Sequence, residues 1–155
     1  MNARGLSNTT KRREIFRWLK MKAYAIYFLQ DVHCTKENSA IFSSLSNASV
    51  GVGILFDNNF TFQILKSYSD PVGRFIIMDI HTENKTLTLA NIYAPNNDDP
   101  FFFENFHIHL LTYNCGELIL GVDFNLVLDV RKDKSGGNPV THENCLKKVQ
   151  YIINP

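Results

Sequence analysis

The sequence predicts a mixed α/β fold in a single domain, and two observations lead to this prediction. The chain has 155 residues, of which 45% are hydrophobic and 20% charged, a composition typical of one globular domain with a sizeable core. Some segments carry apolar residues at helical spacing, whereas others read as strands joined by short turns of Asn, Asp, Gly and Pro. Helices interleaved with antiparallel hairpins predict mixed sheets covered by helices.

The N-terminal elements come first. Segment 7–10, Ser-Asn-Thr-Thr, offers several helix N-caps, and apolar residues at helical spacing predict an amphipathic helix over residues 9–22. Residues 23–29 form a nearly continuous apolar run, which predicts a strand buried on both faces. This strand ends just before Asp31. Residues 34–49 are polar and weakly patterned.

The middle of the chain predicts two hairpins. Strand 51–56 is followed by the turn Asp57-Asn-Asn59 and by an apolar segment, 60–65, which we expect to pair with it. After another turn at Asp70-Pro-Val-Gly73, two strands at 74–81 and 86–93 are joined through residues 82–85.

The C-terminal part predicts two helices around one strand. Residues 94–100 interrupt the pattern and cap a helix over residues 101–113, and the apolar run Leu118–Leu120 predicts a buried strand over residues 117–122. Residues 130–139 are expected to form a loop, before a final helix over residues 142–153.

Composition excludes several classes of protein. The net charge of +1 shows no global basic field, so binding of nucleic acid would rest on a local patch. The cysteines, Cys34, Cys115 and Cys145, are widely spaced, which argues against a disulfide framework or a zinc knuckle and favours an intracellular setting. The longest apolar run, residues 23–29, is too short to span a membrane, and no secretory signal is recognisable.

Polar side chains follow the predicted strands. Asp123 and Asn125 follow one strand, Tyr93 ends another, Asp31 follows the first, and Asn2 lies near the start of the chain. If these strands are neighbours, the polar groups share one edge of a sheet and offer a hard ligand for Mg²⁺, donors to a phosphate and a carboxylate that orients water. For Asp123 and Asn125 alone, an Asx turn is the simpler interpretation.

Six segments in this order resemble the endonuclease domain of non-LTR (LINE-type) retrotransposons, within the endonuclease/exonuclease/phosphatase superfamily. The most specific part is Asn-Ile-Tyr-Ala-Pro-Asn at 91–96 followed by Asp-Phe-Asn at 123–125. The other matching segments are 2–6, 28–33, 51–56 and 70–74.

The resemblance implies a four-layer α/β sandwich that cleaves DNA with Mg²⁺, or with Mn²⁺ in its place. It further implies that Asp31 binds the metal and that Asn2 helps to order metal and phosphate. By the same resemblance, Tyr93 contacts the scissile phosphate, Asp123 orients the attacking water, and Asn125 holds the phosphate. DNA is the implied partner, without a membrane or a small-molecule cofactor, and the implied location is the nucleus or cytoplasm.

The chain also departs from the family pattern. Met1 stands where the family has Trp, Asp31 replaces a metal-binding Glu, and Val122 replaces the second glycine of a Gly-Gly-Asp-Phe-Asn motif. The sequence contains no Ser-Asp-His segment, which in the family supplies a histidine that acts on the phosphate. We therefore expect residues 1–155 to form one truncated, incomplete sandwich without catalytic activity.

Three alternatives to the nuclease remain open at this stage. They are a non-catalytic degenerate fragment, a remnant that binds DNA, and a phosphatase acting on a small or lipid phosphate. Among other residues, we interpret His33 as a structural loop residue and His107 and His109 as surface or packing residues. The segment Lys11–Arg13 is interpreted as a solvated face, and Phe101–Phe103 as core packing.

Overall fold

The structure is a computed structural model that describes residues 1–33, 51–126 and 143–153. Its elements are α1 (Thr9–Lys22), β1 (Ile26–Leu29), β2 (Gly53–Phe56), β3 (Gln63–Ser69), β4 (Phe75–His81), β5 (Thr86–Tyr93), α2 (Pro100–Tyr113), β6 (Glu117–Asp123) and α4 (Glu143–Ile153). The predicted helices and the predicted strands of β4, β5 and β6 agree with these bounds to within about one residue. The loop predicted at 130–139 and the segment 34–49 lie outside the described residues.

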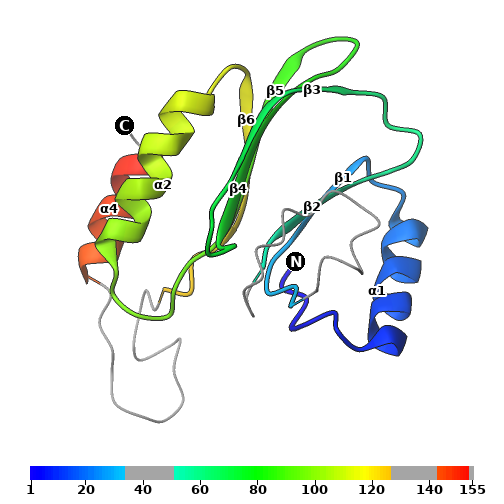
Figure 1. Cartoon of the computed structure of the whole chain (residues 1–155), viewed down its shortest axis with the longest axis horizontal. Coiled ribbons are helices and arrows are strands. Elements are labelled where there is room, and N and C mark those ends of the chain that lie inside the picture. Colours follow the sequence, from blue (N-terminus) through cyan, green and yellow to red (C-terminus); the bar gives the residue numbers. More distant parts are fainter. Residues whose placement is uncertain (34–50, 127–142, 154–155) are drawn as a thin grey trace.

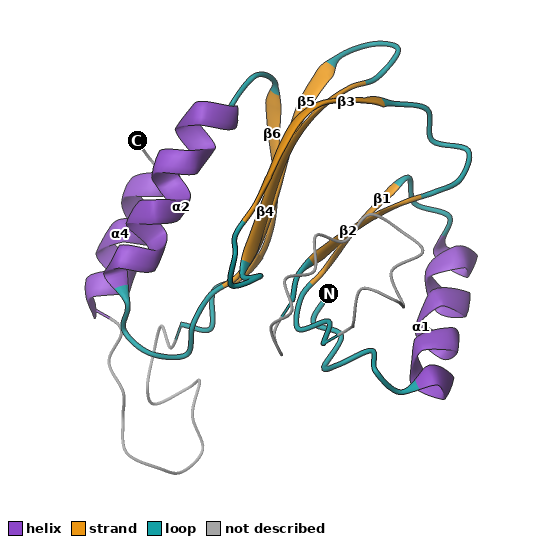
Figure 2. Ribbon diagram, in the orientation of Figure 1, coloured by secondary structure: helices purple, strands orange, loops and turns teal. Residues whose placement is uncertain are grey.

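Four layers are stacked on one another, as Figures 1 and 2 show. Helices α2 and α4 cover one face of a four-stranded sheet, β3-β4-β5-β6, and a two-stranded sheet, β1-β2, faces its other side. Helix α1 covers the outer side of β1-β2. The predicted mixed α/β class is confirmed, with two sheets and three helices in the described part of the chain.

Strand pairing is antiparallel except at β6. Strand β1 pairs with β2, β4 pairs with both β3 and β5, and β6 runs parallel to β5. The β4–β5 hairpin is closed by a hydrogen bond from Thr82 N to Lys85 O, at 2.9 Å. This hairpin was predicted, and it is confirmed.

The other predicted hairpin, between 51–56 and 60–65, is wrong. Strand β2 belongs to one sheet and β3 to the other, so the chain crosses between the sheets after Phe56. Phe60 and Phe62 stack with Phe56 and pack against the core between the sheets. Burial of these aromatic rings favours the crossover, because a large side chain gains more by leaving water than a local turn supplies.

Two strands are less buried than their sequences predict. Strand β1 begins only at Ile26, because Ala23 ends α1 in a left-handed conformation, and of its four residues only Leu29 is fully buried. Strand β6 lies at the edge of its sheet among the described strands, and Leu118 is 42% exposed. The apolar run at 118–120 predicted a buried strand, but β6 is an edge strand among the described strands. Apolar composition alone does not distinguish a central strand from an edge strand.

Alternation along β4 divides the core into two layers. Phe75 and Ile77 face helices α2 and α4, whereas Ile76, Met78 and Ile80 face the β1-β2 sheet. Full burial of such side chains stabilises the fold by about 1.5–3 kcal/mol each.

The aromatic start of α2 contributes unevenly to this core. Phe103 is fully buried, as predicted, whereas Phe101 is 76% exposed, so the prediction of core packing is wrong for Phe101. Nearer the end of α2, His109 packs its ring on Tyr68 at 4.0 Å between centroids, which agrees with a packing role.

Consecutive aspartates cap two different helices. Asp99 accepts a hydrogen bond from Phe102 N at the start of α2, at 3.3 Å. Asp98 accepts from Cys145 N at 3.0 Å and from Asn144 Nδ2 at 2.8 Å, at the start of α4. The N-cap formed by Asp99 is worth about 0.5–2 kcal/mol. The loop that follows Tyr93 is thus held against both helices.

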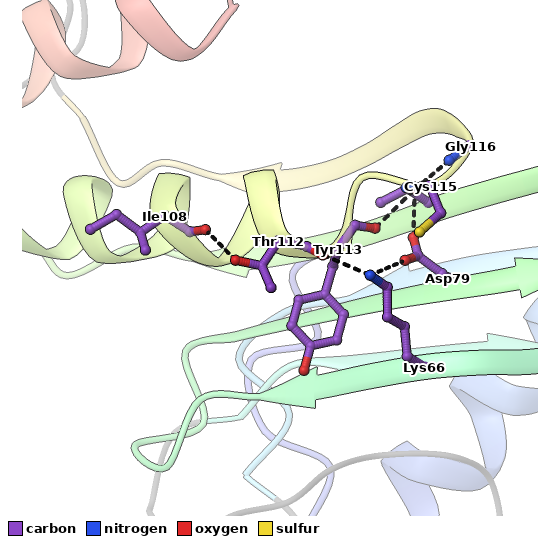
Figure 3. Close-up of polar contacts among 8 residues, drawn as sticks. Lys66, Asp79, Ile108, Thr112, Tyr113, Cys115 and Gly116 are labelled. Atoms are coloured by element: carbon purple, nitrogen blue, oxygen red, sulfur yellow. Dashed lines mark hydrogen bonds and ion pairs between the residues drawn. The ribbon is translucent and has the colours of Figure 1, made fainter.

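A buried polar cluster fixes the turn that leads into β6 (Figure 3). The Thr88 hydroxyl donates to Asp79 Oδ1 at 2.6 Å and accepts from Cys115 N and Gly116 N, both at 3.2 Å. Lys66 Nζ lies 3.6 Å from the fully buried Asp79 carboxylate. This cluster sets where β6 starts and therefore where Asp123 ends it.

Candidate active site

Two of the predicted site residues end neighbouring parallel strands. Tyr93 ends β5 and Asp123 ends β6, and the two residues are paired in register. In parallel strands, residues paired in register lie side by side on the same face of the sheet. The expectation that these strand ends share one edge is therefore confirmed for β5 and β6.

Asn2 joins this edge from the start of the chain. It forms a parallel β-bridge with Gln30, directly after β1, and its Nδ2 donates to Asp123 Oδ2 at 2.8 Å. Its own Oδ1 accepts from Arg4 N at 2.9 Å, which orients the amide. An amide next to one sheet thus holds a carboxylate of the other.

Asn125 completes the same corner. Its Nδ2 donates to Ala94 O at 2.6 Å, and its backbone N donates to Asp123 Oδ1 at 3.3 Å. That second bond is the Asx turn that the residue types favour, so the turn and the clustering of polar groups coexist. The Asn125 backbone has φ 50°, in the left-handed region that asparagine tolerates better than most residues.

Asp31 lies after β1 and contacts His33, which the sequence predicts to be a structural residue of the loop. Its Oδ1 lies 2.5 Å from His33 Nε2, and its backbone oxygen accepts from Gly5 N at 2.7 Å. Both Asp31 and His33 have left-handed backbones, with φ 56° and 46°. Such conformations cost of order 1–3 kcal/mol each and concentrate at functional sites.

Arg74 is a residue beside the site to which the sequence analysis assigned no role. Its guanidinium lies 6.0 Å from the centre of the Tyr93 ring, and its backbone oxygen accepts from Tyr93 N at 2.8 Å. Asp70 Oδ2 accepts from Arg74 N at 2.9 Å, so the turn at 70–73 positions this arginine. Its position at the end of the Asp-Pro-Val-Gly-Arg segment, 70–74, could have indicated that Arg74 lies near the site.

Behind the site, a buried amide pair joins the two sheets. Gln30 Nε2 donates to Asn91 Oδ1 at 2.7 Å, and Asn91 Nδ2 donates to the backbone oxygens of Leu29 and Gly53 at 2.9 and 2.8 Å. Asn91 is completely buried. Because every one of these polar groups is paired, the network fixes the spacing of β5 from β1 and β2.

The N-terminal ammonium group lies next to this network. It donates to Phe28 O at 2.7 Å and to Gln30 Oε1 at 2.8 Å. Burial lowers the pKa of this ammonium, and the negative charge of Asp123 acts in the opposite direction.

A cavity of about 340 Å³ borders the site and is mostly apolar, with Phe28, Gln30, Gly121 and Val122 in its wall. A side chain at Gly121 would place its Cβ 2.4 Å from Phe28 Cγ, so the Phe28 side chain of β1 packs directly against β6 at this glycine. Val122, which replaces a glycine of the family motif, is 38% exposed. Position 121 therefore requires glycine, whereas position 122 accommodates a valine.

Other polar residues and the cysteines differ in their exposure. His81 lies exposed at the end of β4, 3.2 Å from the Thr86 hydroxyl, and Asn96 lies exposed in the loop before α2. Cys115 is exposed and Cys145 buried, and neither forms a disulfide. None of the helices that the structure describes has the length and apolar character needed to cross a bilayer.

Comparison with solved structures identifies the fold. The chain is similar to "Endonuclease domain of TRAS1, a telomere-specific non-LTR retrotransposon", with a TM-score of 0.65, 17% identity, and coverage of 98% of this chain and 68% of that one. No protein-family profile matches the chain.

Sequence comparison gives a second relative. The chain is 31% identical over 144 residues to the "Transposon TX1 uncharacterized 149 kDa protein" of Xenopus laevis. The match covers 84% of this chain and 11% of that protein, so the chain spans a small part of its relative. The two matches confirm the resemblance drawn from the motifs: the chain has the fold of a non-LTR retrotransposon endonuclease domain and is similar in sequence to a transposon protein.

Proposed function

We propose that this chain carries the phosphodiester-cleaving site of a metal-dependent DNA endonuclease. The observation that supports it most is the contact between Asn2 Nδ2 and Asp123 Oδ2, at 2.8 Å. It joins an amide and a carboxylate at the edge where Tyr93 and Asn125 also lie. The fold shared with a retrotransposon endonuclease domain points to the same chemistry.

In this proposal Asp123 orients the attacking water and accepts its proton. The Asn2 amide holds one carboxylate oxygen, and the backbone N of Asn125 holds the other, so both oxygens are fixed before substrate arrives. Removing a positioned general base typically costs a factor of 10²–10⁴ in rate. The carboxylate has a defined direction in which to receive a proton.

Tyr93 and Asn125 would contact the phosphate. Tyr93 stands beside Asp123 in the neighbouring strand, with the Arg74 guanidinium over its ring. That cation favours negative charge near the Tyr93 hydroxyl, which donates to a phosphate oxygen in this scheme. The Asn125 amide is held toward Ala94 O and would share its second N–H with the phosphate.

The donor set fits Mg²⁺, or Mn²⁺ in its place. Asp31 would supply a carboxylate oxygen, and Asn2 an amide oxygen. Mg²⁺ sites commonly use one or two carboxylates and complete their shell with water and substrate phosphate. Asp31 would hold the ion, which when bound would neutralise charge that develops on the phosphate.

A second candidate is a DNA-binding domain that does not cut. It is favoured by the pairing of the Asp31 carboxylate with His33. Over the described residues, moreover, no three side chains of the His, Cys, Asp and Glu types gather as a metal cluster.

Nicking of supercoiled plasmid decides between the candidates. The chain is incubated with Mg²⁺, with Mn²⁺ or with EDTA, beside Asp123→Ala and the surface control Asn105→Ala. Metal-dependent nicking that Asp123→Ala lowers at least about 100-fold supports the endonuclease. Nicking no greater than that of Asp123→Ala refutes it. Phosphate release from small phosphomonoesters without nicking would indicate a phosphatase instead.

A further inference from the structure

The charge of this chain is concentrated at one end. Residues 1–22 hold seven lysines and arginines but a single acidic residue, Glu14, whereas the whole chain has a net charge of only +1. The rest of the chain is therefore net acidic. A near-neutral total conceals a strongly basic N-terminal segment, most of which is helix α1.

Three of these cations form one stripe along α1. Arg13, Arg17 and Lys20 are spaced by four and three residues, which places them on the same face of a helix, and all three are exposed. The buried side of α1, with Leu19, packs against the cluster beneath β1 and β2. Helix α1 is the outer layer on this side of the molecule (Figure 1), and the three cations of the stripe are exposed on it.

The charge of the stripe is not neutralised within the fold. None of the acidic groups in the described ranges forms an ion pair with Arg13, Arg17 or Lys20. The first turn of α1 contains no acidic residue. Like charges at this spacing cost a helix about 0.2–0.5 kcal/mol per pair. A partner with negative charge would offset this repulsion.

The N-terminal end of α1, from which the stripe runs, lies close to the candidate active site. Lys11 Nζ donates to Arg4 O at 2.6 Å, and Arg4 N donates to Asn2 Oδ1 at 2.9 Å, next to Asp123. The N-terminal end of α1 and the end of β6 lie toward the same end of the molecule (Figure 1). From there the basic stripe extends along α1, away from the site.

We propose that Arg13, Arg17 and Lys20 bind the phosphodiester backbone of duplex DNA beside the candidate site. The stripe spans about 10 Å, since a helix rises about 1.5 Å per residue. Along one strand of DNA, phosphates recur about every 3.4 Å of helix axis, so three cations match about three phosphates. The choice of DNA over another polyanion rests on the proposed function.

A lipid surface is the competing partner for the stripe. Helices that lie in a membrane interface bury their apolar face among the lipid chains. On α1, Leu19 is packed and only 5% exposed, whereas Trp18 and Met21 are 48% and 78% exposed. We choose DNA because the stripe begins beside the candidate site, and binding to phosphatidylserine vesicles is an outcome that the test distinguishes.

The test measures binding without cleavage. Fluorescence anisotropy follows a labelled DNA duplex in EDTA over a range of NaCl concentrations, with the chain and with the variant Arg13→Gln/Arg17→Gln/Lys20→Gln. Glutamine keeps the helix propensity and removes the charge. The matched control is Lys147→Gln/Lys148→Gln, exposed on α4 in the opposite outer layer. Circular dichroism melting checks that each variant folds.

We expect the triple variant to bind at least about tenfold more weakly, with the slope of log K against log salt reduced by about 2.7 units. The control should bind like the unmodified chain. Equal affinity and slope for the triple variant would overturn the inference. So would stripe-dependent binding of an RNA duplex or of phosphatidylserine vesicles in the absence of DNA binding.

The inference and the proposed function can fail separately. If DNA binding depends on the stripe but no metal-dependent nicking is found, the inference about the stripe is supported and the proposed endonuclease activity is rejected. If nicking depends on Asp123 but the triple variant binds and nicks normally, the proposed endonuclease activity is supported and the proposed role of the stripe is rejected.

Discussion

Gln30 and Asn91 form a buried hydrogen bond of 2.7 Å that joins the two sheets behind the candidate active site. Gln30 also forms the β-bridge that places Asn2, and Asn91 lies on β5, two residues before Tyr93. Gln30 is thus paired with the site residue Asn2, and Asn91 lies on the same strand as the site residue Tyr93. The pair sets the distance between the layers that the site bridges.

Asn91→Ala should destabilise the fold by about 2–4 kcal/mol, because each buried polar group left without a partner costs about 1–3 kcal/mol. The substitution removes the donors to the Leu29 and Gly53 oxygens and the acceptor of Gln30. Urea unfolding measures the change. Asn105→Ala, at an exposed position of α2, is the control and should change stability by less than about 0.5 kcal/mol. Equal effects of the two variants would show that the network contributes nothing.

Asn125 combines a backbone role with a side-chain role, and two substitutions separate them. Asn125→Ala should lose about 1–2 kcal/mol of stability, because φ 50° is unfavourable for a residue with an ordinary Cβ. Asn125→Gly should fold more stably than the alanine variant, since glycine accepts this conformation. Both variants should lose nicking equally if the amide acts on the phosphate. Nicking retained by Asn125→Gly would assign the residue to the turn alone.

Acid stability should depend on Asp98. Hydrogen bonds from Cys145, and secondarily from Asn144, lower the pKa of Asp98 below its ordinary value of 3.8. A carboxyl group whose pKa is lower in the folded state stabilises the fold above its unfolded pKa, and this contribution is lost as the pH falls below it. Asp98→Asn should therefore unfold with a smaller difference between neutral and acidic pH. Thermal melting across that range measures it, and a difference as large as in the unmodified chain would contradict the assignment.

Gly121→Ala should destabilise the fold by about 1–3 kcal/mol, because the new Cβ would lie 2.4 Å from Phe28 Cγ. Val122→Ala, one position away and 38% exposed, is the control and should change stability much less. The double variant Gly121→Ala/Phe28→Ala tests the contact directly. In a double-mutant cycle the two changes should cost less together than their separate costs added, because the second removes the clash. Strict additivity would show that Gly121 and Phe28 do not constrain each other.

The sequence by itself determined the local elements and the candidate residues. Helical spacing and capping residues predicted α1, α2 and α4, and the turn at 82–85 predicted the β4–β5 hairpin. The motifs predicted which polar residues end their strands, because strand ends and the Asx residues that follow them are local features. The Asp123–Asn125 segment was open to two interpretations, and its hydrogen bonds support both the turn and the clustering.

Only the tertiary structure decided which strands pair and which residues meet. The segment after Phe56 leaves its sheet because burial of its aromatic rings between the sheets outweighs a local hairpin, and no local pattern records that balance. The pairing of Asn2 with Asp123 spans 121 positions of sequence, and the pairing of Gln30 with Asn91 spans 61. Contacts at such separation depend on how the layers stack, which is set by the summed burial of many side chains. The order of the residues supplied the chemistry of the site, and the packing of the two sheets supplied its geometry.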